Sequence, residues 1–338
     1  MKFLDKYLTL WIFLAMALGV MLGQFSGITE ALQRPNGSIH PGLALGLVAM
    51  MLPPLAKVNL RELPGVFQQR RLLATSMLLN WIVGPLVMFA LAWLFVRDQP
   101  GYFNGLMLIG LARCIAMVVV WNDLACGNRT YAAGLVALNS LFQLAFYALY
   151  ASFFLNMAPK LLGITTSVPI HVSPWLVAES VALYLGLPFA LGQLIRALSL
   201  KFKGEPWFAD VLMPRLSPLT LFALLGTIVF MFSLKGDQML ALPLDVLRLA
   251  LPLTTYFVLM FFFTFWIARR QGAPYSTTAA LAFTSAGNNF ELAIAVAIAS
   301  FGLNSEEAFA GVVGPLIEVP VLVLLVQVAL RLRARFVA

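Results

Sequence analysis

Apolar residues occupy this chain in long runs that carry almost no charge and are separated by short polar stretches. An α-helix needs a run of about 20 apolar residues to cross a bilayer. The pattern therefore predicts ten spanning helices, over residues 8–26, 41–58, 72–96, 105–125, 130–156, 173–196, 214–234, 244–268, 277–300 and 310–331. The first run has no convincing cleavage site, so we expect a retained helix rather than a signal peptide.

Composition and charge agree with a polytopic membrane protein. Hydrophobic residues make up 61% of the 338 and charged residues 11%, whereas a soluble domain carries about 25% charged residues. We expect residues 1–338 to form a single all-α transmembrane domain. If the N-terminus is cytoplasmic, the lysines and arginines of the outer loops are only Arg34, Arg97, Lys160, Lys235 and Arg248. This asymmetry predicts that both termini are cytoplasmic, and it accounts for the net charge of +8 without a nucleic-acid partner.

Two segments resemble each other at an offset of a little over half the chain length. "ACGNRTYAAGLVALN" and "SFGLNSEEAFAGVVGPL" share a glycine-containing turn followed by an Ala-Gly pair, and the same offset matches Cys114 with Asn289. Five spans per half place the halves in opposite orientations, which is the inverted-repeat plan of many secondary transporters. We expect repeat one at about residues 1–158 and repeat two at about 170–338. Ten helices with an accidental similarity remain the alternative.

Several predicted spans contain polar side chains. The ninth run places Ser285, Asn288, Asn289 and Glu291 around Gly287. Such groups satisfy the backbone of an unwound helix, which is tolerated in a membrane only inside protein or beside a cavity. Other spans contain Asn80, Trp93, Asn139, Gln143, Glu179 and Tyr256. The pattern leaves open whether the amides line a pathway or act as hydrogen-bonding links between helices.

Glu318 stands alone between Pro315 and Pro320 in the tenth run. Because Pro320 has no N–H, the helix is loosened beside the carboxyl group. An isolated acid in hydrocarbon is costly and usually marks an ion pathway, so we expect Glu318 to carry protons. Glu291 is a second candidate, either lining the pathway or pairing with Arg113.

Arg113 and Cys114 are adjacent in the fourth run. An arginine at the centre of a membrane helix costs about 3 kcal/mol on insertion scales, which favours a functional role. Neighbours along a helix do not face each other, so contact between these two side chains requires unwound backbone. A single thiol is suited to a thiophilic substrate that must be released again, whereas we expect Cys126 to be an ordinary cysteine.

The stretches "GLARCIAMVVVWNDLACGNRTYAAGLVALNS", "TSAGNNFELAIAVAIASFG" and "VVGPLIEVP" closely resemble arsenite efflux permeases of the Acr type, in the bile acid/arsenite/riboflavin transporter superfamily. The resemblance runs over essentially the whole chain. It implies export of arsenite, and in some members antimonite, across the plasma membrane (the inner membrane in bacteria) in exchange for protons. It also implies that the fourth and ninth of ten helices, in two inverted five-helix repeats, are broken and cross each other.

The same resemblance assigns the essential thiol to Cys114 and the essential acid of the tenth helix to Glu318. It assigns the other substrate-pathway positions to Asn80, Trp93, Arg113, Trp121, Asn139, Asn289 and Glu291. It implies arsenite or antimonite at Cys114, protons as the coupling ion, no cofactor and no obligatory protein partner.

Two other classes of function fit the sequence less well. A sodium-coupled organic anion symporter of the same superfamily would use the ninth-run amides to bind sodium, but its large substrate would not need a thiol. An intramembrane enzyme is not expected, because the sequence has no paired intramembrane aspartates, no His-Glu-x-x-His run and no Gly-x-Ser-x-Gly turn.

Overall fold

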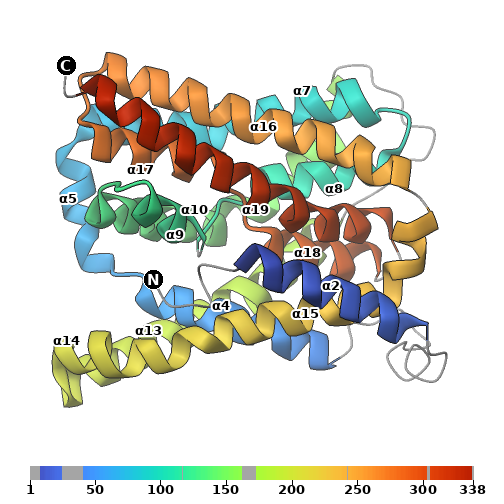
Figure 1. The fold of residues 1–338 in the computed structure, drawn as a ribbon, viewed down its shortest axis with the longest axis horizontal. Coiled ribbons are helices and arrows are strands. Elements are labelled where there is room, and N and C mark those ends of the chain that lie inside the picture. The colour runs from blue at the N-terminus through green and yellow to red at the C-terminus, as the bar shows by residue number, and fades with distance from the viewer. Residues whose placement is uncertain are drawn as a thin grey trace.

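The computed structural model describes residues 8–24, 41–115, 117–161, 173–241, 243–302 and 305–336, and these are almost entirely helical (Figure 1). Residues 1–7 and Arg34, which entered the charge argument, lie outside the described part of the chain. All ten predicted runs are occupied by helix. Two runs contain a pair of helices joined by a π-helical turn (α6 with α7, and α12 with α13), and two contain a pair of separate short helices (α8 with α9, and α17 with α18). The helices are α2 (Leu8–Gly23), α4 (Pro41–Lys57), α6 (Arg70–Leu78) with α7 (Gly84–Val96), α8 (Pro100–Leu111) with α9 (Met117–Leu124), α10 (Arg129–Ser152), α12 (Pro174–Val181) with α13 (Leu187–Phe202), α15 (Met213–Ala241), α16 (Pro243–Arg270), α17 (Tyr275–Ala286) with α18 (Phe290–Phe301), and α19 (Glu306–Arg333).

Within the described residues, six helical stretches are long and apolar enough to cross a membrane. They are Arg70–Val96, Arg129–Met157, Pro174–Phe202, Gly204–Phe230, Leu244–Arg270 and Glu306–Arg333. Shorter apolar helices include Phe13–Gly23, Ala44–Lys57 and Phe290–Phe301. The short helices α5 (Leu63–Gln68), α11 (Ala158–Leu161) and α14 (Gly204–Trp207) lie outside the predicted runs.

Four π-helical turns interrupt the long helices, and each ends two residues before a proline. The turns are Leu79–Val83, Phe153–Met157, Ala182–Gly186 and Phe208–Leu212, and the prolines are Pro85, Pro159, Pro188 and Pro214. A proline has no N–H and its ring clashes with the carbonyl four residues back. Widening the helix by one residue avoids that clash: the N–H of Gly84, for example, donates to the carbonyl of Leu79.

The helices form two groups. In one, α15 packs along α2 and α4, and α13 packs on α4 (lower part of Figure 1). In the other, α16 packs against α7, α17 and α19, while α8 packs against α7 and α19 (upper part of Figure 1). The short helices α9 and α18 pack against α19 and so belong to the second group, and α18 also contacts α4 of the first group. The boundary between the two groups therefore lies beside the broken helices.

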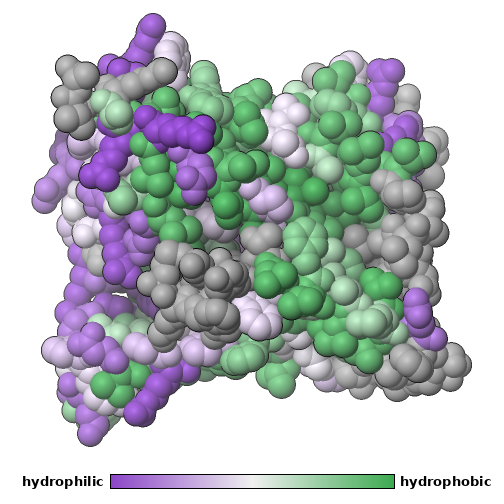
Figure 2. Space-filling view, in the orientation of Figure 1, coloured by the Kyte–Doolittle hydropathy of each residue, from purple (hydrophilic) through white to green (hydrophobic). Residues whose placement is uncertain are grey.

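Apolar and polar residues are segregated along the helix axes. Figure 2 shows a broad apolar band across the middle of the molecule, with hydrophilic residues gathered mainly at the end that contains α5, α14 and the C-terminal ends of α16 and α19. Arg269 and Arg270 end α16, and Arg331 and Arg333 end α19. This is the surface that a bilayer requires, with one strongly basic end.

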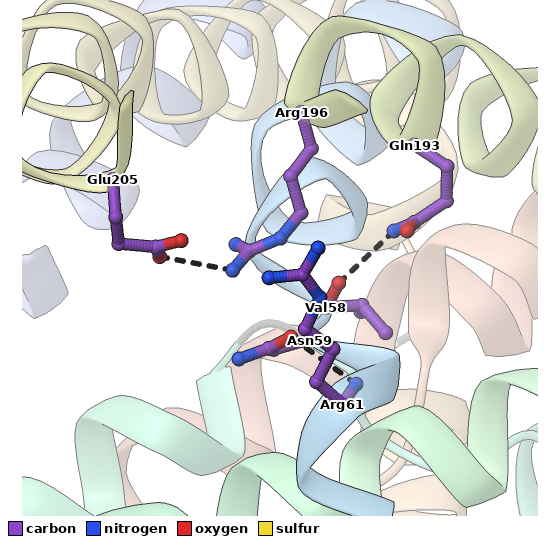
Figure 3. Close-up of polar contacts among 6 residues, drawn as sticks. All are labelled: Val58, Asn59, Arg61, Gln193, Arg196 and Glu205. Carbon is purple, nitrogen blue, oxygen red and sulfur yellow. Dashed lines mark hydrogen bonds and ion pairs between the residues drawn. The ribbon is translucent and has the colours of Figure 1, made fainter. Parts of the chain in front are cut away.

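A polar cluster fixes the point where the chain leaves α4 (Figure 3). The side chain of Gln193, on α13, donates to the carbonyl of Leu55 (2.9 Å), in the last turn of α4, and to the carbonyl of Val58 (3.0 Å), the first residue after α4. Next to it, Arg196 forms an ion pair with Glu205 at 3.0 Å (Figure 3). A Cβ on Gly192 would lie only 2.7 Å from the backbone N of Ala56, so α4 and α13 are packed backbone to backbone.

Candidate functional site

The two broken runs cross each other at their interruptions. α8 ends at Leu111 and α9 begins at Met117, while α17 ends at Ala286 and α18 begins at Phe290. Between these ends, Arg113 and Asn288 form an antiparallel β-bridge. The N–H of Cys114 donates to the carbonyl of Gly287 at 3.3 Å, and the N–H of Asn289 donates to the carbonyl of Ala112 at 3.0 Å. Each interrupted segment thus supplies backbone partners that the other lost by unwinding.

Side chains satisfy the remaining carbonyl groups at the end of α8. The amide of Asn288 donates to the carbonyls of Ile109 (2.8 Å) and Ala112 (3.1 Å). On α10, the amide of Gln143 both donates to the carbonyl and accepts from the N–H of Arg113, at 3.0 Å each. The hydroxyl of Tyr147 donates to the carbonyl of Leu108 at 2.8 Å. The end of α8 and the backbone of Arg113 are therefore held by side chains from α10 and from the other interrupted segment.

The Arg113 side chain is completely buried and points toward the ends of α8 and α17. Its Nη1 donates to the hydroxyl of Tyr256 at 2.7 Å and to the carbonyl of Ser285 at 3.4 Å, and its Nη2 donates to the carbonyl of Gly110. Among the described residues, no ion pair joins Arg113 to a carboxylate. Pairing of Arg113 with Glu291, one of two possibilities left open by the sequence, is thus not the arrangement found.

Cys114 and Glu318 both approach the crossing next to Gly287. The Cys114 side chain is buried, and its Sγ accepts from the N–H of Val118 at 3.3 Å, in the first turn of α9. The Glu318 carboxyl accepts from the N–H of Asn288 at 3.2 Å, just before α18. A Cβ added to Gly287 would lie 3.0 Å from Cβ of Cys114 and 3.4 Å from Oε1 of Glu318. The thiol therefore lies at the positively polarised N-terminal end of α9, and the carboxyl group lies at that of α18.

A cavity lies between the two helix groups, beside this crossing. Its wall is mostly apolar, and the polar side chains in it are Glu291, Glu318 and Thr227. The full lining consists of Leu47, Met50, Met117, Leu224, Thr227, Ile228, Phe290, Glu291, Ile294, Val312, Pro315, Glu318 and Val319. Glu291 on α18 and Glu318 on α19 thus face a space that α4 and α15 line from the other side.

The remaining predicted site residues divide into three placements. Asn289 lies at the crossing and caps α18 by accepting from the N–H of Leu292 at 3.1 Å. Asn139 accepts from the indole N–H of Trp81 at 3.1 Å, and Asn80 donates to Ser76 at 3.2 Å, so both amides make links between or within helices. Trp121 is buried on α9, and its indole N–H has no partner within the described residues.

Two residues singled out by the sequence lie on the outside of the molecule. The Trp93 side chain is 41% exposed, with the Arg97 guanidinium 5.4 Å from its ring centre. The Trp93 side chain thus lies on the surface of the described structure, and its place in a substrate pathway stays a prediction. Glu179 is likewise exposed, on α12.

Sequence reasoning missed how three helix residues support the site. In the sequence, Gln143 and Tyr256 stand out only as polar residues within spans, and Tyr147 does not stand out. One signal was available: Asn139, Gln143 and Tyr147 recur every fourth residue along α10, which places them on one face. A polar stripe on a spanning helix indicates a face that packs against polar partners inside the protein.

Comparisons with known proteins cover nearly the whole chain. Residues 44–242 match the sodium bile acid symporter family. The arsenical-resistance protein Acr3 of Corynebacterium glutamicum is 48% identical over 97% of this chain and 89% of its own length. The Acr3 protein of Alkaliphilus metalliredigens is 30% identical over 99% and 94%. An uncharacterized transporter of Synechocystis is 32% identical over 96% and 88%.

Proposed function

Since this chain belongs to the Acr3 family of arsenical-resistance proteins, within the wider sodium bile acid symporter family, we propose that it exports arsenite from the cell in exchange for protons. Antimonite, which has the same trivalent chemistry, is the second substrate of the proposal. The site of exchange is the crossing of the two broken helices, with Cys114 as the metalloid ligand and Glu318 as the proton carrier.

One observation carries this proposal: the buried side chains of Cys114 and Glu318 both lie next to the same glycine, where a Cβ on Gly287 would be 3.0 Å from Cβ of Cys114 and 3.4 Å from Oε1 of Glu318. A soft sulfur ligand favours a thiophilic substrate. A carboxyl group in an apolar surrounding is the kind of group that takes up and releases protons during transport. Because the two groups lie so close together, binding of the substrate and binding of the proton can exclude each other.

The charge of the substrate explains why proton coupling is needed. Arsenous acid is mainly uncharged near neutral pH, so a membrane potential alone does no work on it. An inward flow of protons can supply that work if the same site releases arsenite outside and takes up a proton there. Glu291, which lines the same cavity, is the second candidate for this exchange.

The proposal includes a membrane arrangement. We place ten crossings in the bilayer, with the two halves as inverted repeats and both termini in the cytoplasm, the membrane being the bacterial inner membrane. Three features support this: helix in all ten predicted runs, the antiparallel bridge between corresponding breaks, and the basic end formed by the last turns of α16 and α19. The cavity between the two helix groups then gives the substrate its access.

The test is uptake of labelled arsenite into everted membrane vesicles under an imposed pH gradient, compared for the parent, Cys114→Ser and Cys126→Ser. Cys126 is exposed in the turn after α9, so its nearly isosteric replacement is a matched control and should transport normally. Cys114→Ser should lose uptake while the protein remains in the membrane. Equal uptake by Cys114→Ser and the parent would exclude a sulfur–arsenic bond in the cycle.

A second candidate function is sodium-coupled import of an organic anion, and the match to the sodium bile acid symporter family favours it. The buried Oδ1 atoms of Asn80 and Asn288, which have no partner within the described residues, are suitable oxygen ligands. Imposing a sodium gradient in place of the pH gradient distinguishes the two. Sodium-driven uptake of a labelled bile acid into right-side-out vesicles, unaffected by a protonophore, together with no arsenite uptake into everted vesicles, would favour this second function.

A further inference from the structure

The charge of Arg113 is buried where the C-terminal ends of two half-helices meet. α8 ends beside its Gly110 contact and α17 ends beside its Ser285 contact. The C-terminal end of a helix carries the equivalent of about half a negative charge, from carbonyls without helical partners. Two such ends together supply about one negative charge, which matches the single positive charge of the guanidinium.

Tyr256 completes this arrangement from a third helix. Its hydroxyl accepts from Nη1 of Arg113 at 2.7 Å, and its ring lies 5.8 Å from the centre of the guanidinium. The side chain is fully buried on α16. Space for the contact comes from α7, where a Cβ on Gly84 would lie 3.0 Å from the tyrosine hydroxyl and 3.1 Å from Nη1. The guanidinium is therefore held by groups on α8, α16 and α17, in a space left open by the glycine of α7.

This orientation directs the positive charge away from the groups proposed to do the transport. Cys114 and Glu318 receive N–H groups at the N-terminal ends of α9 and α18, whereas Arg113 donates to the C-terminal ends of α8 and α17. The crossing thus separates its polar groups by sign: acids and thiol at the positive helix ends, arginine at the negative ones. A substrate ligand would instead need donors free to reach the cavity, and the residues that line the cavity do not include Arg113.

We propose that Arg113 and Tyr256 are a positioning pair: the guanidinium neutralises and ties together the carbonyl ends of α8 and α17, and Tyr256 fixes its direction. The pair holds the bridge between Arg113 and Asn288 closed, and so keeps Cys114 in place beside Gly287. Arg113 acts on the substrate only through this geometry. The proposal rests on the proposed function, because only transport requires Cys114 to be kept in place. That the pair keeps the crossing closed can be tested without transport.

The test measures how readily Cys114 reacts, which requires no arsenite. In a Cys126→Ser background Cys114 is the single cysteine, and its rate of alkylation by N-ethylmaleimide reports opening of the crossing. Tyr256→Phe removes one hydroxyl that bonds to a charged group. The fraction of protein molecules with an open crossing, and with it the alkylation rate of Cys114, should therefore rise about tenfold. Thr264→Val is the matched control, because it removes another buried hydroxyl of α16 that has no partner within the described residues. It should leave the rate unchanged.

Substitutions of Arg113 separate charge from geometry. Arg113→Lys keeps the positive charge but lacks the planar guanidinium, whose several N–H groups bond to both helix ends at once. The alkylation rate of Cys114 in this variant should therefore fall between those of the parent and Arg113→Met. If Arg113→Met does not accumulate in the membrane, Tyr256→Phe and Arg113→Lys still decide the question. Parental alkylation rates in both would overturn the positioning pair, as would an Arg113→Lys variant that changes only the KM for arsenite.

Transport by the same proteins keeps the two proposals apart. If the parent fails to accumulate arsenite but Tyr256→Phe still exposes Cys114, the proposed function falls and the positioning pair stands. If the parent transports arsenite and Tyr256→Phe changes neither alkylation nor transport, the positioning pair falls and the proposed function stands.

Discussion

Gly287→Ala tests the crossing with a single added methyl group. The backbone at Gly287 is extended, with φ −77° and ψ 148°, and alanine adopts this conformation without strain. Any effect must therefore come from crowding by the new Cβ, which would lie 3.0 Å from Cβ of Cys114 and 3.4 Å from Oε1 of Glu318. Since carbon atoms pack best at about 3.5–4.0 Å, Cys114 or the whole bridge has to move by about half an ångström.

The size of the effect follows from the packing around the glycine. Overpacking a well-filled interior costs about 1–3 kcal/mol, and every 1.4 kcal/mol is about a factor of ten. We expect arsenite uptake into everted vesicles to fall by about five- to a hundredfold, with normal amounts of protein in the membrane. Gly65→Ala is the control, because a Cβ there meets nothing within 4 Å. Parental uptake by Gly287→Ala would refute the close meeting of the thiol and the carboxyl group on which the proposed mechanism depends.

Three further substitutions test separate parts of the site. Glu318→Gln mimics the permanently protonated acid and should abolish uptake driven by a pH gradient; accumulation equal to the parent, with the same response to a protonophore, would transfer the coupling role to Glu291. Gln143→Leu leaves both backbone groups of Arg113 without their side-chain partner, so the melting temperature in detergent should fall by an amount equivalent to about 1–3 kcal/mol. Asn288→Leu removes two hydrogen bonds to the end of α8 and should destabilise the protein at least as much as Gln143→Leu; a smaller shift would mean that the carbonyls find other donors.

The positions of the helices were largely predictable, because the bilayer imposes both the length and the apolar character of a spanning segment. The interruptions in the fourth and ninth runs were also visible, as polar clusters beside glycine. The π-helical turns were not predicted, although each precedes a proline in a readable pattern. A proline in an apolar run predicts a local disturbance, but whether the helix kinks or widens depends on packing.

The sequence predicted which residues lie together at the crossing better than it predicted how their side chains are oriented. The sequence indicated Cys114, Glu318 and Asn289, and the structure brings these three to one crossing. The sequence did not indicate that Arg113 would turn toward Tyr256, because Tyr256 is far away in the chain and its position depends on how α16 packs. The exposure of Trp93 could not be predicted for a related reason: residue type says nothing about the rotation of a helix about its axis, and this ring lies on the surface of α7.

The antiparallel bridge has a consequence for biosynthesis. Arg113 emerges from the ribosome and enters the membrane long before Tyr256, Ser285 and Asn288 have been made. Until the second half arrives, a charged side chain and an unwound stretch of backbone lack these partners, and hydrocarbon offers none in their place. The first half must therefore wait at the translocon, or keep water around its unfinished helix, until the ninth segment is inserted. A chain truncated after α10 should consequently be degraded, and co-expression of the missing half should rescue it.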